Sequence, residues 1–185
     1  MAKIHYIILF LFTFPAWSQT GNYYITNYSI SDYGAADQNW CSIQDEYGRM
    51  FIANNNGILL NDGKSWKIIK LRNDGRCISL DKNKKNKIFV GGENEFGYLS
   101  TSENGQIIYQ SLSKELPLKD REFGYVWATR CINDEVFFGS NEKLFWYKDG
   151  KIKSFSPESE GFHTFFLKLV NTSLSGKNRW DSKYL

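Results

Sequence analysis

The stretch DEYGRMFIANNNGILLNDGKSW, residues 45–66, decides the fold class because it alternates turn residues with short β-prone runs. The runs MFIAN and GILLND are apolar, and both are short enough for single strands. The dipeptide Asp62-Gly63 is favoured in tight hairpin turns, because those turns need positive φ angles. The stretch therefore predicts two strands joined by a turn, and a hairpin that leads from the second of them to another strand beginning at Trp66.

The same pattern recurs in two later parts of the chain. The strings MFIAN, KIFVGG and EVFFGS each mark a second strand, and Phe51, Phe89 and Phe137 occupy matching places in them. A third strand, a turn with glycine and a fourth strand follow in every unit. The units return about every 40 residues, which is the period of a β-propeller blade made of four antiparallel strands.

We therefore predict an all-β chain, a β-propeller fragment of about three four-stranded blades. The run NYYITNYSI, residues 22–30, precedes the first unit. It is predicted to be an N-terminal closing strand that completes the last blade of the ring. A twisted, open β-sandwich is the alternative, and the regular four-strand period disfavours it.

Residues 1–18 have the composition of a secretory signal peptide. Lys3 supplies a positive start, YIILFLFTF is a short apolar run, and Ala16 and Ser18 are the small residues of a cleavage site. The apolar run is shorter than the roughly 20 residues that span a bilayer, which disfavours an uncleaved anchor. We expect a mature chain that begins near Gln19 and is exported to the periplasm or the cell envelope.

The partial propeller is expected to occupy residues 19–166. Residues 167–185, LKLVNTSLSGKNRWDSKYL, lose the strand and turn pattern and are rich in Asn, Ser and basic residues. We interpret them as an aberrant tail, which a frameshift in the gene would explain. The product is then expected to be truncated before any later domains.

Charge and histidine content restrict the function. The chain has 23 basic and 20 acidic residues, so it lacks the basic excess of a nucleic-acid-binding protein. Without the signal peptide, His163 is the sole histidine, which disfavours catalytic triads and His-based metal sites. Most carboxylates fall in turns, where Asp and Glu are solvated or cap the turn. We expect no enzymatic activity, no catalytic residue, no cofactor and no metal.

Three cysteines remain in the exported chain: Cys41, Cys77 and Cys131. An odd number leaves at least one thiol unpaired. Each cysteine lies near the start of a repeat unit, so we expect similar strand positions in neighbouring units. Small buried residues are the favoured interpretation over a disulfide.

A repeated Glu-Phe-Gly-Tyr string is the best local indication of a ligand or interface region. It occurs at residues 95–98 and again at 122–125, inside an insertion, and both copies are expected on one rim of the ring. The candidate residues are Glu95, Phe96, Tyr98, Glu122, Phe123, Tyr125 and Trp127.

Aromatic side chains give a second possible role, because flat rings can stack on sugar faces. Packing between blades is the favoured interpretation, since propellers bury large aromatic residues between their sheets. The residues that could stack on a sugar are Trp40, Trp66, Trp127, Trp146, Tyr98 and Tyr125.

Two strings, QNWCSIQDEYGRMFIANNNGILLNDGKSW and KIFVGGENEFGYL, carry a family resemblance. They resemble the N-terminal periplasmic sensor propeller of Bacteroidetes-type two-component and triple-tyrosine helix-turn-helix transcriptional regulators, over residues 22–166. In that family the exported propeller precedes a triple-tyrosine β-domain, one membrane helix and a cytoplasmic output module. This chain departs from the family pattern at its end.

The resemblance implies an extracytoplasmic sensory, ligand-binding region of a membrane-bound signalling and transcription regulator. Its partner would be an unknown extracytoplasmic ligand, such as a glycan fragment, and this segment would bind no nucleic acid. Intact relatives are expected to be membrane-anchored dimers. The alternative is a free-standing, secreted carbohydrate-binding propeller or propeller enzyme.

Overall fold

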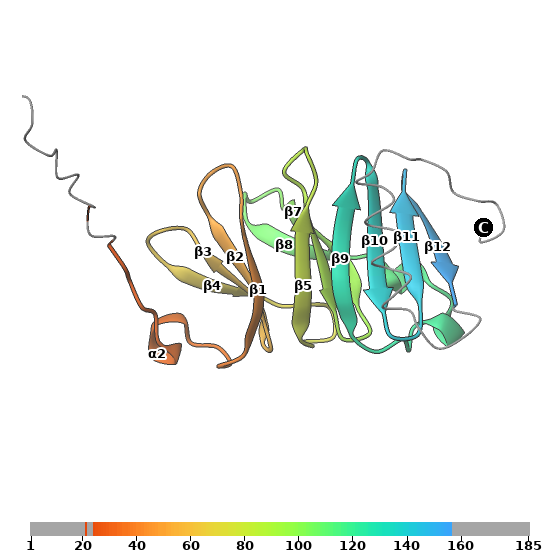
Figure 1. Ribbon diagram of the computed structural model, residues 1–185, viewed down its shortest axis with the longest axis horizontal. Helices are drawn as coiled ribbons and strands as arrows, with labels where there is room; N and C mark the ends of the chain where they lie inside the picture. Colours follow the sequence, from red (N-terminus) through yellow and green to blue (C-terminus); the bar gives the residue numbers. More distant parts are fainter. Residues whose placement is uncertain (1–20, 22–23, 157–185) are drawn as a thin grey trace, which may run out of the picture.

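The computed structural model describes residue 21 and residues 24–156 of the chain. Its strands form three four-stranded antiparallel sheets. Figure 1 shows the sheets side by side in the order of the sequence. The predicted all-β class and the three four-stranded blades are confirmed. The predicted signal peptide, His163 and the tail at 167–185 lie outside the described residues.

Each sheet is a meander in which strands neighbouring in sequence are also neighbours in space. The first blade consists of β1 (Asn39–Gln44), β2 (Met50–Asn54), β3 (Gly57–Asn61) and β4 (Trp66–Ile69). The second consists of β5 (Cys77–Lys82), β6 (Ile88–Gly92), β7 (Phe96–Thr101) and β8 (Ile107–Ser111). The third consists of β9 (Val126–Ile132), β10 (Glu135–Ser140), β11 (Leu144–Lys148) and β12 (Lys151–Phe155).

The turn carboxylates close the hairpins of the first blade. Asp45 Oδ1 accepts the backbone N–H of Arg49 at 2.8 Å, and Asp45 Oδ2 accepts Arg49 Nε at 2.7 Å. Asp62 Oδ1 accepts the backbone N–H groups of Lys64 and Ser65 at 2.9 and 2.8 Å. Such short-range bonds satisfy turn N–H groups that the strand ladders leave unpaired, which explains the Asp residues at these places.

The first strands of the blades, β1, β5 and β9, lie side by side and are called the inner strands here. The thiol of Cys41 lies 3.9 Å from the carbonyl oxygen of Ile78. Between β5 and β9, Ser79 Oγ donates to the Val126 carbonyl near their starts, and further along Asp81 Oδ2 accepts the backbone N–H of Cys131 at 2.8 Å. Early residues contact early residues and late residues contact late ones, so the inner strands run in the same direction.

Two apolar cores fill the spaces between the blades. Phe51, Phe89 and Phe137 are buried in equivalent places, as the repeat predicts. Between the first and second blades the core consists of Phe51, Ala53, Ile58, Leu60, Ile69, Leu71, Cys77, Leu80, Ile88, Val90 and Leu99. Between the second and third it consists of Phe89, Phe96, Leu112, Leu116, Phe123, Val126, Val136, Phe138 and Phe145.

A glycine permits the close contact between the second and third blades. A Cβ atom on Gly91 would lie 2.5 Å from Val126 Cγ1 and 2.5 Å from Ser79 Oγ. In the space that this glycine leaves, Ser79 Oγ donates to the Val126 carbonyl at 2.8 Å and lies 2.8 Å from Thr129 Oγ1. These buried polar bonds join β5 to β9 in a fixed register.

The insertion between the second and third blades packs onto the second core. It contains two short 3₁₀ helices, η1 (Ser113–Glu115) and η2 (Leu118–Asp120). Leu116 is buried between them, and Arg121 Nε donates to its carbonyl at 2.9 Å. The ion pair of Lys143 Nζ with Asp120 Oδ1, at 2.7 Å, ties the insertion to the third blade.

The predicted closing strand at residues 22–30 is absent from residues 24–30, the part of it that the structure describes. Residues 24–29 pair with no sheet, and the short helix α2 (Ile30–Tyr33) follows them. A closing strand needs a blade with three strands of its own, and each of the three described sheets already has four consecutive strands. Among the described residues, no helix is both long enough and apolar enough to cross a membrane.

Candidate ligand-binding site

The structure brings the two Glu-Phe-Gly-Tyr strings together. Asn94 Oδ1 accepts the backbone N–H groups of Phe123 and Gly124 at 2.8 and 2.7 Å, and the Asn94 N–H donates to the Gly124 carbonyl at 2.9 Å. Next to these bonds, Glu93 and Tyr125 form an isolated antiparallel bridge. The insertion therefore lies against the turn between β6 and β7, and the two strings are neighbours in space.

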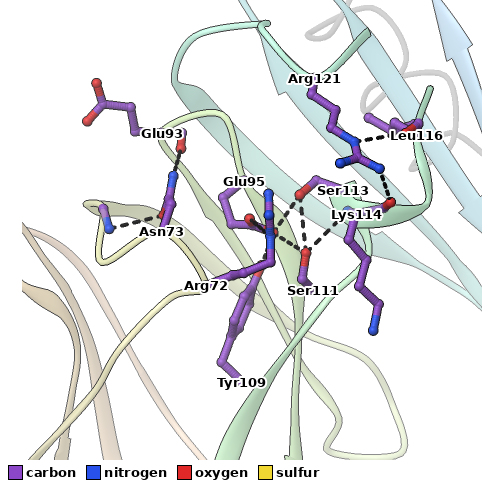
Figure 2. Close-up of polar contacts among 11 residues, drawn as sticks. Arg72, Asn73, Glu93, Glu95, Tyr109, Ser111, Ser113, Lys114, Leu116 and Arg121 are labelled. Atoms are coloured by element: carbon purple, nitrogen blue, oxygen red, sulfur yellow. Dashed lines mark hydrogen bonds and ion pairs between the residues drawn. The ribbon is translucent and has the colours of Figure 1, made fainter. Parts of the chain in front are cut away.

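Glu95 is fully buried, and its carboxylate accepts four hydrogen bonds. The Oε1 atom accepts Tyr109 Oη at 3.0 Å and Ser113 Oγ at 2.6 Å, and it also accepts the Ser111 hydroxyl. The Oε2 atom accepts Arg72 Nε at 2.9 Å. Figure 2 shows these groups converging on the carboxylate from different segments of the chain.

The Glu95 carboxylate is therefore a structural group whose hydrogen-bonding capacity is used within the chain. A buried carboxylate of this kind is stable only because both oxygens have donors. Burial and the nearby carboxylate raise the pKa of Tyr109 well above its usual value, which keeps this phenol a donor. The network fixes the connection between the first and second blades, because Arg72 lies in it.

Three further candidates are buried or partly buried side chains. Phe96 and Phe123 are fully buried with ring centroids 5.7 Å apart, inside the core between the second and third blades. Tyr98 is partly buried, and Lys87 Nζ lies 3.3 Å from its ring centroid. Burial lowers the pKa of this lysine. Glu122, in contrast, is exposed in the insertion.

Tyr125 and Trp127 belong to an exposed group that crosses all three blades. The Trp127 ring lies 5.3 Å from that of Tyr125 and 5.8 Å from that of Trp40, centroid to centroid. Trp40 and Trp127 keep 41% and 40% of their surface exposed. Arg76 Nη1 donates to Tyr125 Oη at 3.1 Å, and Arg76 Nε lies 4.0 Å from Glu93 Oε2. We call Trp40, Arg76, Glu93, Tyr125 and Trp127 the aromatic patch.

Backbone bulges place the two tryptophans. Asn39 and Cys41 pair with Asn54 and Ala53, so Trp40 has no partner in the ladder. In the third blade Trp127 is skipped in the same way, between Val126 and Ala128. A bulge redirects the side chain of the extra residue and is frequent beside functional sites. The second blade has its bulge at the equivalent place.

Hydrogen bonds hold the polar members of the patch. Trp40 Nε1 donates to Asn55 Oδ1 at 2.9 Å, which fixes the indole orientation. The Glu93 N–H donates to the Arg76 carbonyl at 3.2 Å, and Asn73 Nδ2 donates to the Glu93 carbonyl at 2.9 Å. Figure 2 shows the Asn73 bond beside the Glu95 network. The patch residues are thus held in place by the connections between the blades, without a bound ligand.

Sequence reasoning named Trp40 as a stacking residue but not as a site residue, and it missed Arg76 and Glu93. The alignment of the units held part of a signal. The bulge residues Trp40 and Ile78 lie eleven residues before Phe51 and Phe89, whereas Trp127 lies ten before Phe137, because the first turn of the third blade is one residue shorter.

The other aromatic candidates lie apart from the patch. Trp66 packs against Tyr28 and Tyr33, with ring centroids at 5.2 and 5.7 Å. Trp146 lies on β11, where Lys153 Nζ is 5.0 Å from its ring centroid. These two rings pack on the first and third blades and not between blades. Tyr98 packs against the core between the second and third blades, as the favoured interpretation has it.

The three cysteines are free thiols, but they do not share one strand position. Cys41 pairs with Ala53, Cys77 with Gly92 and Cys131 with Val136, so their registers differ. The expectation of similar positions was wrong. Cys77 is the first residue of β5, Cys41 the third of β1 and Cys131 the sixth of β9. Burial raises the pKa of all three thiols. Within residues 24–156, no three His, Cys, Asp or Glu side chains form a metal-like cluster.

The solved structures that this chain resembles include two of the extracellular domain of BT4673 from B. thetaiotaomicron. One, described as part of a one-component system, has 22% identity and a TM-score of 0.45, and covers 64% of this chain and 16% of its own. The other, described as part of a hybrid two-component system, has 19% identity and a TM-score of 0.43, and covers 63% and 15%.

This chain therefore spans about one sixth of the length of those structures. Both are extracellular domains of a signalling protein, which is the kind of region that the sequence was expected to resemble. No family model matches the chain, and no curated protein matches it.

Proposed function

We propose that this chain is the extracytoplasmic sensory region of a membrane-bound signalling and transcription regulator. It binds a ligand outside the cytoplasm, and domains beyond this segment relay the signal. The ligand is a glycan fragment, and the segment itself performs no catalysis and binds no nucleic acid. The signal-peptide composition of residues 1–18 supports export to the periplasm or the cell envelope.

The observation that carries the proposal is the aromatic patch. Trp40 and Trp127 are large apolar side chains that remain two-fifths exposed although each blade has an apolar core available. Both tryptophans lie at the bulges of equivalent strands, whereas Ile78 at the bulge of the second blade is buried. Exposed aromatic groups beside fixed polar groups are typical of ligand sites.

The carboxylates support binding without catalysis. Glu95 uses both oxygens on Arg72, Tyr109 and two serines, and Asp45 uses both on its own turn and Arg49. A glycosidase needs two carboxyl groups that face one another across a bond of the substrate. In the patch Glu93 is the carboxylate, and it is paired with Arg76.

Two measurements test the proposal. The chain, expressed with its own N-terminus, should appear in the periplasmic or envelope fraction. When the purified chain is mixed with an extract of oligosaccharides, the mixture should raise its melting temperature, and chromatography should show the sugars unchanged. Retention in the cytoplasm, or release of shorter sugars, would contradict the proposal. Sugar release would instead support the secreted enzyme.

A further inference from the structure

The aromatic patch is electrically balanced. The guanidinium of Arg76 and the carboxylate of Glu93 are its charged groups, and their side chains are 48% and 41% exposed. A separation of 4.0 Å is too long for a hydrogen bond, so this pair attracts without using its donors and acceptors on itself. The Arg76 guanidinium has five N–H donors, and within the patch one of them is used in the bond to Tyr125.

The aromatic rings present faces in fixed and different orientations. The planes of Trp40 and Trp127 are inclined by 75°, and those of Tyr125 and Trp127 by 59°. Trp40 cannot turn freely, because its indole N–H is bonded to Asn55. A rigid ligand with one flat apolar face and polar edges fits such a surface better than a flexible apolar chain does.

From this arrangement we propose that the patch binds a neutral saccharide. The C–H face of one sugar ring stacks on Trp127 or Trp40. Two neighbouring hydroxyl groups bridge the charged pair: one accepts from Arg76, and the other donates to Glu93. This inference rests on the proposed function and assigns the ligand class and the roles of these residues to its site.

The opposite charges of Arg76 and Glu93 determine whether the patch prefers a neutral sugar or an acidic one. A carboxylate or sulfate on the ligand would gain the attraction of Arg76 but would face the Glu93 carboxylate beside it. Like charges at this distance oppose each other, and in a partly exposed site the two effects offset. Hydroxyl groups can use both members of the pair, because they donate and accept.

The test is isothermal titration of the purified chain with short neutral oligosaccharides (cello-, xylo-, malto- and manno-series) and with oligogalacturonides. We expect at least one neutral series to bind and the oligogalacturonides to bind more weakly. Trp127→Ala should lower the affinity for the neutral sugar at least about tenfold, since a tenfold change in affinity corresponds to the loss of one good contact. Tyr47→Ala is the matched control, because Tyr47 is an exposed aromatic residue beyond the opposite end of β1.

Glu93→Gln gives a second, independent prediction. It removes the negative charge and leaves Arg76 uncompensated, so the variant should lose affinity for the neutral sugar and gain affinity for oligogalacturonides. A melting curve for each variant separates loss of binding from loss of folding. Because the glutamine amide is nearly isosteric with the carboxylate, we expect the fold to be retained.

The outcomes separate this inference from the proposed function. If no neutral oligosaccharide binds, or if binding is unchanged in Trp127→Ala and Glu93→Gln, the inference is overturned. Stronger binding of oligogalacturonides by the unaltered chain overturns it as well, and so does capture of a protein partner by the patch. In each case the proposed location of the chain is tested separately, by the cell fractionation described above.

Discussion

Trp40 of the first blade and Trp127 of the third blade meet edge to face, with ring centroids 5.8 Å apart, although a complete blade separates them in the sequence. Each ring comes from a residue that its strand ladder skips. The pair therefore depends on the relative position of two blades that share no sheet. The contact between the two rings therefore indicates whether the inner strands are packed side by side.

This pair should give exciton coupling in the circular dichroism spectrum, because the two indoles are close and steeply inclined. Trp40→Phe and Trp127→Phe should each remove the same coupled band, and the double variant should lose nothing more from that band. Trp66→Phe is the control, since Trp66 packs against Tyr28 and Tyr33. Persistence of the band in either single variant would refute the contact.

Removal of the buried carboxylate should destabilise the chain strongly. Glu95→Ala leaves the hydroxyls of Ser111 and Ser113 and the phenol of Tyr109 without their acceptor. We expect the free energy of unfolding to fall by about 3 kcal/mol or more, because each buried donor left without an acceptor costs about 1–3 kcal/mol. Urea denaturation measures this change.

The matched variant for this experiment is Glu122→Ala, in the exposed copy of the same sequence string. Its effect should stay within about 0.5 kcal/mol. An equal loss in both variants would mean that the Glu95 network contributes no more than the exposed glutamate.

Phe138 should be one of the most sensitive positions in the core. Its ring lies 4.6 Å from that of Phe96, centroid to centroid, and both rings are fully buried between the second and third blades. Phe138→Ala should cost about 3–5 kcal/mol through lost burial and the cavity left behind. Leu118→Ala, at an exposed apolar residue of the insertion, should change stability by less than about 0.5 kcal/mol.

The same denaturation curves check this comparison. If Phe138→Ala were as mild as Leu118→Ala, the aromatic core would not hold the two blades together. A single cooperative transition is expected for the unaltered chain, because the core residues of neighbouring blades are shared.

Tyr109 should make stability depend on alkaline pH. Its pKa is raised in the folded chain by burial and by the Glu95 carboxylate, whereas in the unfolded chain it is about 10. The folded state therefore keeps the proton that the unfolded state loses. This contribution is complete below about pH 10 and is lost as the pH rises from there toward the folded-state pKa.

The measurement compares the unaltered chain with Tyr109→Phe, which cannot ionise at this position. The difference in unfolding free energy between the two should narrow as the pH rises above about 10. A difference that stays constant through this range would show that Tyr109 does not titrate differently in the folded and unfolded chains.

The cysteines should react slowly while the chain is folded. Burial raises the pKa of Cys41, Cys77 and Cys131, and the thiolate is the reactive form. With a thiol-disulfide colour reagent at neutral pH, we expect slow labelling of the native chain and rapid labelling of all three thiols in urea. One reactive thiol in urea, instead of three, would reveal a disulfide.

The strands and their order could be predicted from the sequence because their signals are local. Alternating apolar residues in MFIAN and GILLND, with Asp62-Gly63 after them, specify a hairpin without reference to the rest of the chain. The closing strand could not be judged in this way. Residues 24–29 have strand-forming residues, but a strand also needs a partner edge, and that depends on other segments.

The ligand candidates show a similar division. The two Glu-Phe-Gly-Tyr strings were expected on one rim of the ring, and the Asn94 bonds place them next to each other. Burial was not foreseeable from the strings, so Glu95 and Phe123 were grouped with the accessible Tyr125. Arg76 carries no motif at all, because its place in the patch comes from the connection between two blades.

The shared bulge also leaves one residue of each inner strand without a part in strand pairing. Trp40, Ile78 and Trp127 stand outside the paired ladders, so none of them sets the register of its sheet. Exchange of a side chain at these places leaves the strand pairing intact, and where the residue is exposed it also spares the core. Substitutions at Trp40 and Trp127 could therefore change the proposed ligand preference while the strand pairing is kept.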